Sequence, residues 1–210
     1  MDKTKYIKAN SVAFSGHRTI AVDRKDEIRK KLRGKIRLLY AMGITNFYCG
    51  MALGFDMLAA EVVISLKAEL TNLKLIAVIP YDGQNERWSA REQDRYWDIL
   101  DKADNAILLS KHYFNGCLLR RNDYMLSHSC GLIAFFDGKP KGGTFYTCRK
   151  AKSMGMTSSI CTRHKYNKRK LLRMNDIVSL FVVFFVFKAL GGTLKSLFHG
   201  DKRNDFRRDR

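Results

Sequence analysis

Five short apolar runs recur between residues 11 and 137, and a longer amphipathic stretch separates each run from the next. Runs of this length are typical of buried strands, whereas the stretches between them are long enough for helices. Parallel strands need crossover connections of about a dozen residues, which this spacing provides. The pattern predicts an α/β chain whose five strands are Ser11–Ser15, Thr45–Cys49, Leu73–Ile79, Asn105–Ser110 and Leu132–Asp137.

The intervening stretches carry helical periodicity and helix boundary signals. In the first of them, Asp23 offers an N-cap, Ile28 and Leu32 repeat at helical spacing, and Gly43 ends the helix. The other predicted helices are Phe55–Leu70, one that ends at Leu100, Leu118–Ser129, and one from Thr144 to about Met154. Right-handed crossovers would cover both faces of a mainly parallel sheet, a doubly wound architecture. Its ligands are expected beyond the carboxyl ends of the strands.

The residues that follow the first strand have the chemistry of an anion site. Gly16 lets the backbone turn tightly, and Ser15 and His17 offer hydrogen bonds. Arg18 adds a forked cation suited to a phosphate or a carboxylate. The structural alternative is a turn whose arginine is simply solvated.

Two glycines, Gly50 and Gly54, separate the second strand from its helix. Free backbone N–H groups and the helix dipole favour an anion at such a junction, although the spacing matches neither GxGxxG nor a Walker A loop. Asp56 either stabilises the start of the helix or binds a ribose hydroxyl. The sequence leaves both roles open.

Pro80, Gln84 and Trp88 follow the third strand. A tryptophan among polar residues can stack on a base, or it can pack its loop onto the core. Both interpretations stay open from the sequence.

Two further junctions carry the same kind of chemistry. Gly142, Gly143 and Thr144 open the last predicted helix, and Arg121 and Asn122 lie near the start of another. Because several strand ends offer anion-binding groups together, the sequence predicts a nucleotide-type site.

Charge favours anionic partners. Lys and Arg number 39 against 20 Asp and Glu, a net charge of +19. Residues 161–210 are the more basic part, with 13 Lys and Arg against 4 Asp and Glu. These residues are expected to offer non-specific contacts to nucleic acid or to an acidic membrane surface.

The five cysteines form no CxxC pair, and the first ten residues are polar. These features predict free thiols and a cytoplasmic location. No metal and no required cofactor are predicted.

Five runs between Ser11 and Met156 carry a family resemblance: SGHR, GMALGFDMLAAE, VIPYDGQNERW, YFNGCLLRRNDYM and LIAFFDGKPKGGTFYT. Together they resemble the YpsA-like branch of the SLOG superfamily. The resemblance implies a Rossmann-like domain over residues 1–160 whose pocket binds a nucleotide or a derivative such as ADP-ribose or NAD. Relatives include phosphoribohydrolases and DprA-type DNA-processing proteins. The implied pocket residues are Gly16, His17, Arg18, Gly50, Gly54, Asp56, Gly142, Gly143 and Thr144, with less certain roles for Pro80, Gln84, Trp88, Arg121 and Asn122.

One departure from the superfamily bears on activity. The phosphoribohydrolase branch has a carboxylate shortly after its glycine-rich turn, whereas here Thr144 is followed by Phe-Tyr-Thr-Cys-Arg. Cleavage of an N-riboside usually needs a nearby carboxylate. The leading hypothesis is therefore a binding module or sensor for a nucleotide-derived ligand. The alternatives are an N-ribosyl hydrolase and a DprA-like nucleic-acid-binding protein, and an oligomer is left open.

Residues 161–210 do not resemble the superfamily. Their apolar run, Ile177–Phe187, is shorter than the roughly 20 residues that a spanning helix needs. The sequence leaves four interpretations of this extension open: a membrane span, a surface-associated segment, an extra strand or partner-binding segment, and an aberrant tail.

Overall fold

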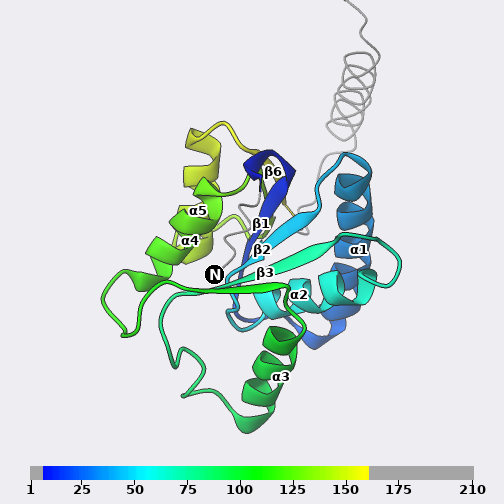
Figure 1. The fold of residues 1–210 in the computed structure, drawn as a ribbon. Helices are drawn as coiled ribbons and strands as arrows, with labels where there is room; N and C mark the ends of the chain where they lie inside the picture. Colours follow the sequence, from blue (N-terminus) through cyan, green and yellow to red (C-terminus); the bar gives the residue numbers. More distant parts are fainter. Residues whose placement is uncertain (1–6, 161–210) are drawn as a thin grey trace, which may run out of the picture. The chain divides into compact units, whose positions relative to one another are not determined.

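The computed structural model describes residues 7–160, and these build a parallel six-stranded sheet in the order β4-β3-β2-β1-β5-β6 (Figure 1). The strands are β1 (Ser11–Gly16), β2 (Asn46–Cys49), β3 (Lys74–Ile79), β4 (Asn105–Leu108), β5 (Gly131–Phe135) and β6 (Thr157–Ile160). The five predicted strands and the Rossmann-like architecture are confirmed. The sixth strand was missed, because β6 is a short TSSI segment without an apolar run and is defined only by its pairing with β5.

Helices cover both faces of the sheet, as predicted. They are α1 (Lys25–Ala41), α2 (Phe55–Leu66), α3 (Ala90–Asp101), α4 (Cys117–Ser127) and α5 (Gly142–Ser153), with short 3-10 turns at Lys8–Asn10 and Val22–Arg24. The expected N-cap at Asp23 is wrong. Asp23 lies inside the second 3-10 turn, and the residue before α1 is Arg24, whose side chain caps nothing.

Alternate residues of β1, β2, β3 and β5 supply two separate cores. Along β1, Val12 and Phe14 pack with α1, α2 and α3, whereas Ala13 packs with α4 and α5. Figure 1 shows the two groups of helices on opposite sides of the strands. The period-two alternation of a strand thus fixes which helices each side chain meets.

The chain order places a crevice between β1 and β5. From β1 the chain winds outward through β2 and β3 to β4, then returns through α4 to lie beside β1 as β5. β1 and β5 end together, since Gly16 pairs with Phe135. Such a reversal of winding leaves a ligand crevice at the carboxyl ends of the strands.

None of the helices between residues 7 and 160 combines the length and the hydropathy that a membrane span needs. The extension, residues 161–210, lies outside the described residues, and so does its apolar run Ile177–Phe187.

Candidate functional site

A cavity of about 470 Å³ opens at the carboxyl end of β1. Its walls come from the β1–α1 connection, the start of α2, the loop from β4 to α4, and the first residues of α4 and α5. The lining residues are Ser15, Gly16, His17, Arg18, Ala52, Asp56, Tyr113, Asn115, Gly116, Cys117, Leu118, Leu119, Arg121, Asn122, Gly143 and Thr144. The volume lies within the range of small-molecule sites.

The residues after β1 form one wall of the cavity, and backbone contacts hold them in place. The His17 N–H donates to the Phe135 carbonyl of β5, and the His17 carbonyl accepts from the Phe55 N–H at the start of α2. The His17 ring is held as well, because the backbone N–H of Asp137 donates to its Nε2 at 3.0 Å. Arg18, which follows, is exposed and lines the cavity. This wall offers an exposed cation on a fixed backbone.

Asp56 and Arg121 form a buried pair at the cavity, with 4.0 Å between Asp56 Oδ2 and Arg121 Nη1. Burial raises the pKa of the Asp56 carboxyl to about 6, although Arg121 and a hydrogen bond from the Ala52 N–H act in the opposite direction. Burial also lowers the pKa of the Arg121 guanidinium, and Asp56 opposes that shift. Asp56 is the only carboxylate among the described residues that line the cavity.

Arg121 is fixed by further contacts that join β2, α4 and α5. Its Nη1 donates to the Gly50 carbonyl, and its Nε donates to Asn122 Oδ1 at 2.8 Å. Asn122 Nδ2 donates in turn to Thr147 Oγ1 at 2.9 Å, and the Thr147 hydroxyl donates to the Gly143 carbonyl. The guanidinium therefore reaches the cavity already oriented, which reduces the ordering cost of binding an anion.

Two helices begin at the cavity. A left-handed glycine precedes α4 at Gly116 (φ 90°), and α5 begins at Gly142 (φ 83°). The first N–H groups of a helix have no partner within the helix, and the helix dipole adds partial positive charge there. Gly143 and Thr144 are in the lining, so the start of α5 lies at the cavity where the anion site was predicted.

Gly50 and Gly54, which were predicted to contact a phosphate, lie outside the lining and pack closely on neighbouring residues. A Cβ at Gly54 would overlap the Arg18 carbonyl oxygen, and Gly54 has φ +82°. A Cβ at Gly50 would overlap the Arg121 guanidinium. Gly16 is in the lining, but a Cβ there would overlap the Phe55 side chain. These glycines allow the chain to pack closely on itself around the site.

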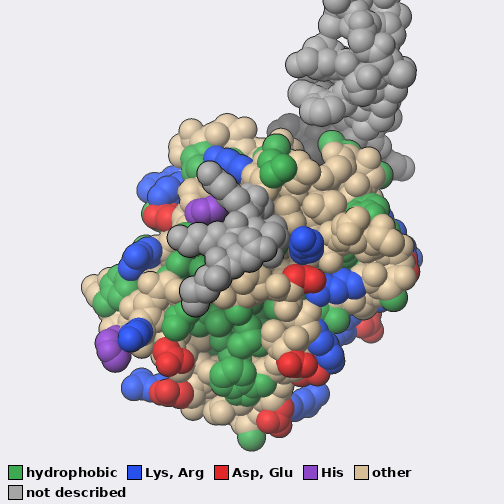
Figure 2. All heavy atoms as spheres, viewed as in Figure 1, with side chains coloured by type: hydrophobic (Ala, Val, Ile, Leu, Met, Phe, Trp, Pro, Cys, Tyr) green, Lys and Arg blue, Asp and Glu red, His purple; other side chains and the backbone are tan. Residues whose placement is uncertain are grey.

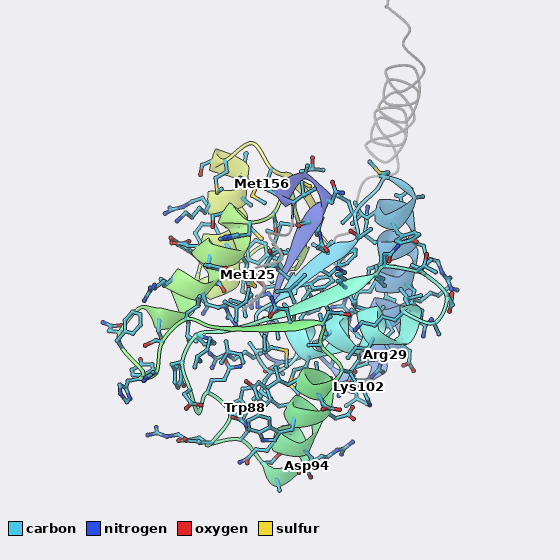
Figure 3. All side chains as sticks on the ribbon, in the orientation of Figure 1. Arg29, Trp88, Asp94, Lys102, Met125 and Met156 are labelled. Carbon is cyan, nitrogen blue, oxygen red and sulfur yellow. The ribbon has the colours of Figure 1, made fainter. Side chains whose placement is uncertain are left out.

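The three residues predicted after β3 also lie outside the lining. Pro80 is buried, and Gln84 is buried with its Nε2 donating to the Met51 carbonyl at 3.1 Å. Trp88 packs on the core and meets Tyr96 of α3 edge to face, with ring centroids 5.6 Å apart. Figure 3 shows Trp88 beside α3. Trp88 therefore has the packing contacts of the second interpretation, and it lies outside the lining of this cavity.

The loop before α4 was missed by sequence reasoning, although it supplies part of the lining. It contributes Tyr113, Asn115 and Gly116, and α4 itself adds Cys117, Leu118 and Leu119. The segment is part of the run YFNGCLLRRNDYM, and it follows a predicted strand as the other candidate junctions do. That position was the available signal.

Comparison with known proteins identifies the family. A model described as the YspA SLOG family matches residues 16–168, which is more than half of the chain. The chain belongs to this family. The resemblance to the YpsA-like branch of the SLOG superfamily is thereby confirmed.

Bacterial relatives within the family carry UPF0398 names. The chain is 31% identical over 127 residues to a UPF0398 protein of Halalkalibacterium halodurans, covering 60% of this chain and 67% of the relative. A UPF0398 protein of Shouchella clausii is 30% identical over 129 residues, covering 60% and 69%.

A solved structure shares the fold. DNA processing protein A from Helicobacter pylori aligns with a TM-score of 0.54 at 17% identity, over 83% of this chain and 76% of that one. That structure describes a single-stranded DNA binding mode of the Helicobacter protein.

Proposed function

We propose that this protein is a cytoplasmic binding module, or sensor, for a nucleotide or a nucleotide-derived ligand whose phosphate lies in the cavity at the end of β1. One observation carries the proposal. Two arginines, Arg18 and Arg121, and the starts of two helices, α4 and α5, meet at a single cavity of about 470 Å³. Such groups are the usual ligands of phosphate, because they combine charge with oriented N–H donors.

The two arginines have different parts in this proposal. Arg121 is buried and held by Gly50 and Asn122, so its charge is fixed in place. Arg18 is exposed, and it closes on the phosphate from the β1 side. Asp56, beside Arg121, offsets part of the positive charge of the site. Its carboxylate is also the group that would bind a ribose hydroxyl of the ligand.

Binding is preferred over N-ribosyl hydrolysis because none of the five residues after Thr144 is acidic and Asp56 already faces Arg121. If Asp56 were catalytic, its raised pKa would suit a proton donor near neutral pH. Incubating the protein with nucleotides, ADP-ribose and NAD, and measuring released base or nicotinamide, separates the two functions. We expect no turnover.

The test is calorimetric titration of the full chain with AMP, ADP-ribose, NAD and cyclic nucleotides, with thermal shifts as a first screen. A ligand at 100 times its Kd adds about 2.7 kcal/mol of stability. Arg18→Gln should weaken binding of the best ligand about tenfold, because it removes a charged hydrogen bond. Arg91→Gln, on the exposed surface of α3, is the matched control and should bind as the wild type does. Equal binding by Arg18→Gln and wild type would argue against this site.

Single-stranded nucleic acid is a second candidate ligand. It is supported by the net charge of +19 and by the shared fold with the Helicobacter protein, whose ligand is single-stranded DNA. In this alternative the cavity would receive one phosphate of the strand. Competition between AMP and an oligonucleotide would place both ligands at the same site.

A further inference from the structure

Two aromatic rings line the cavity, those of His17 and Tyr113, and the Tyr113 ring is the exposed one. Tyr113 is the only Tyr, Phe or Trp among the described residues that line the cavity. Its residue surface is 64% exposed, which is unusual for a large aromatic side chain. The other lining groups are polar or aliphatic apart from the His17 imidazole, whose Nε2 already accepts the Asp137 N–H.

Tyr113 is supported from one side and open elsewhere. Its ring meets the Tyr81 ring edge to face, with centroids 5.2 Å apart and an interplanar angle of 82°. A perpendicular neighbour covers at most one face of Tyr113, which accords with the high exposure. Tyr81 lies in the connection just after β3 and follows the buried Pro80.

The loop that carries Tyr113 is held on both sides by hydrogen bonds. The Ser110 hydroxyl donates to the His112 carbonyl at 2.8 Å, and the Ser110 carbonyl accepts from the Asp82 N–H. After Tyr113, the Cys117 N–H donates to the Phe114 carbonyl at 3.1 Å. The ring is therefore presented by an ordered turn, and binding to it requires little reorganisation.

Phe114, the next residue in the chain, adds a second exposed aromatic ring to this loop, and Arg120 adds a cation. Phe114 is 38% exposed, and the Arg120 guanidinium lies over its ring at 5.7 Å. In Figure 1 the loop projects at the left of the molecule, and in Figure 2 hydrophobic and basic side chains lie beside one another on that side. An aromatic platform among cations is the usual surface for nucleobases, whose faces stack on rings while phosphates meet the cations.

We infer that Tyr113 is the base-stacking residue of this protein, so that the ligand's phosphate lies between Arg18, Arg121 and the helix starts while its nucleobase lies flat on the Tyr113 ring at the rim. This inference rests on the proposed function and narrows it: the ligand carries a base as well as a phosphate. Stacking involves the π face that every base has, so adenine and guanine nucleotides should bind with similar affinity. Base stacking was one of the two roles that the sequence left open for Trp88.

The experiment compares AMP with ribose 5-phosphate, which keeps the sugar phosphate and lacks the base. Calorimetric titration of the full chain should give a Kd for AMP about tenfold or more below that for ribose 5-phosphate. Tyr113→Ala should raise the Kd for AMP by about the same factor and leave ribose 5-phosphate unchanged. Tyr113→Phe keeps the ring and should keep the preference for AMP.

Trp97→Ala is the matched control, since Trp97 is an aromatic residue with 56% exposure that lies outside the cavity lining. It should bind both probes as the wild type does. If Tyr113→Ala kept the wild-type preference for AMP, or if the wild type bound both probes equally, the stacking role would be overturned while the phosphate site stood. If the wild type bound neither of these probes nor ADP-ribose, NAD or a cyclic nucleotide, the proposed function would fail and this inference with it.

Discussion

At the scale of single residues, the Asp56–Arg121 pair is the strongest electrostatic feature of the site. Both side chains are buried, and their closest charged atoms are 4.0 Å apart, longer than a direct hydrogen bond. Burial therefore outweighs the attraction, and the pKa of Asp56 is raised to about 6. A carboxyl that is harder to ionise in the fold than in the unfolded chain makes stability depend on pH.

We expect Asp56→Asn to change that pH dependence. The folded wild type keeps the Asp56 proton up to about pH 6, whereas an unfolded chain releases it near 3.8. Unfolding thus releases a proton between these values, and this group's contribution to stability falls as pH rises through the window. The wild type should gain on the order of 2 kcal/mol over Asp56→Asn between pH 7 and pH 4.

Urea unfolding of both proteins at several pH values measures the difference between their free energies of unfolding. The contributions of the other carboxylates largely cancel in that difference. A difference between the two proteins that stayed constant from pH 4 to 7 would mean that burial does not raise the pKa of Asp56.

At the scale of elements, the connection from β2 to α2 is held against the residues after β1. Gly54, with φ +82°, lies so close to the Arg18 carbonyl that no Cβ fits, and Phe55 donates its N–H to the neighbouring His17 carbonyl. The start of α2 therefore sets the position of one wall of the cavity. A glycine that sequence patterns associate with phosphate contact has a packing role here.

Gly54→Ala should lower the free energy of unfolding by roughly 2 kcal/mol or more, because it adds a backbone clash to the strain of a positive φ. Gly43→Ala is the matched control. Gly43 has φ +88°, and a Cβ added there would meet no atom within 4 Å, so only the strain of about 1 kcal/mol applies. Urea unfolding compares the two variants, and equal losses would show that the close approach at Gly54 relaxes without cost.

At the scale of the whole molecule, positive charge is spread over the chain but is densest in residues 161–210. Those residues hold 13 of the 39 Lys and Arg and only 4 of the 20 Asp and Glu. Long-range attraction to polyanions depends on the summed positive charge of these residues rather than on any single contact.

We expect weak binding of the full chain to a labelled single-stranded oligonucleotide, with an affinity that falls steeply as salt rises, because binding releases counterions. Deleting residues 161–210 should remove most of the salt-dependent binding and leave AMP binding unchanged. Fluorescence anisotropy between roughly 50 and 200 mM salt measures this. Tight binding by residues 1–160 at the higher salt would instead make nucleic acid the principal ligand of the domain.

The sequence by itself determined the parallel α/β layering. The amphipathic stretches between the apolar runs are long enough for the crossover connections that parallel strands need. It also placed Ser15, His17, Arg18, Gly143 and Thr144 at strand ends, which a parallel sheet brings to one edge. Tertiary structure alone decided that β1 and β5 are neighbours, that Asp56 faces Arg121, and that Tyr113 rather than Trp88 meets the cavity. The physical reason is that local periodicity records which side of an element is buried, whereas strand order and the side on which a loop packs depend on contacts between residues far apart in the chain.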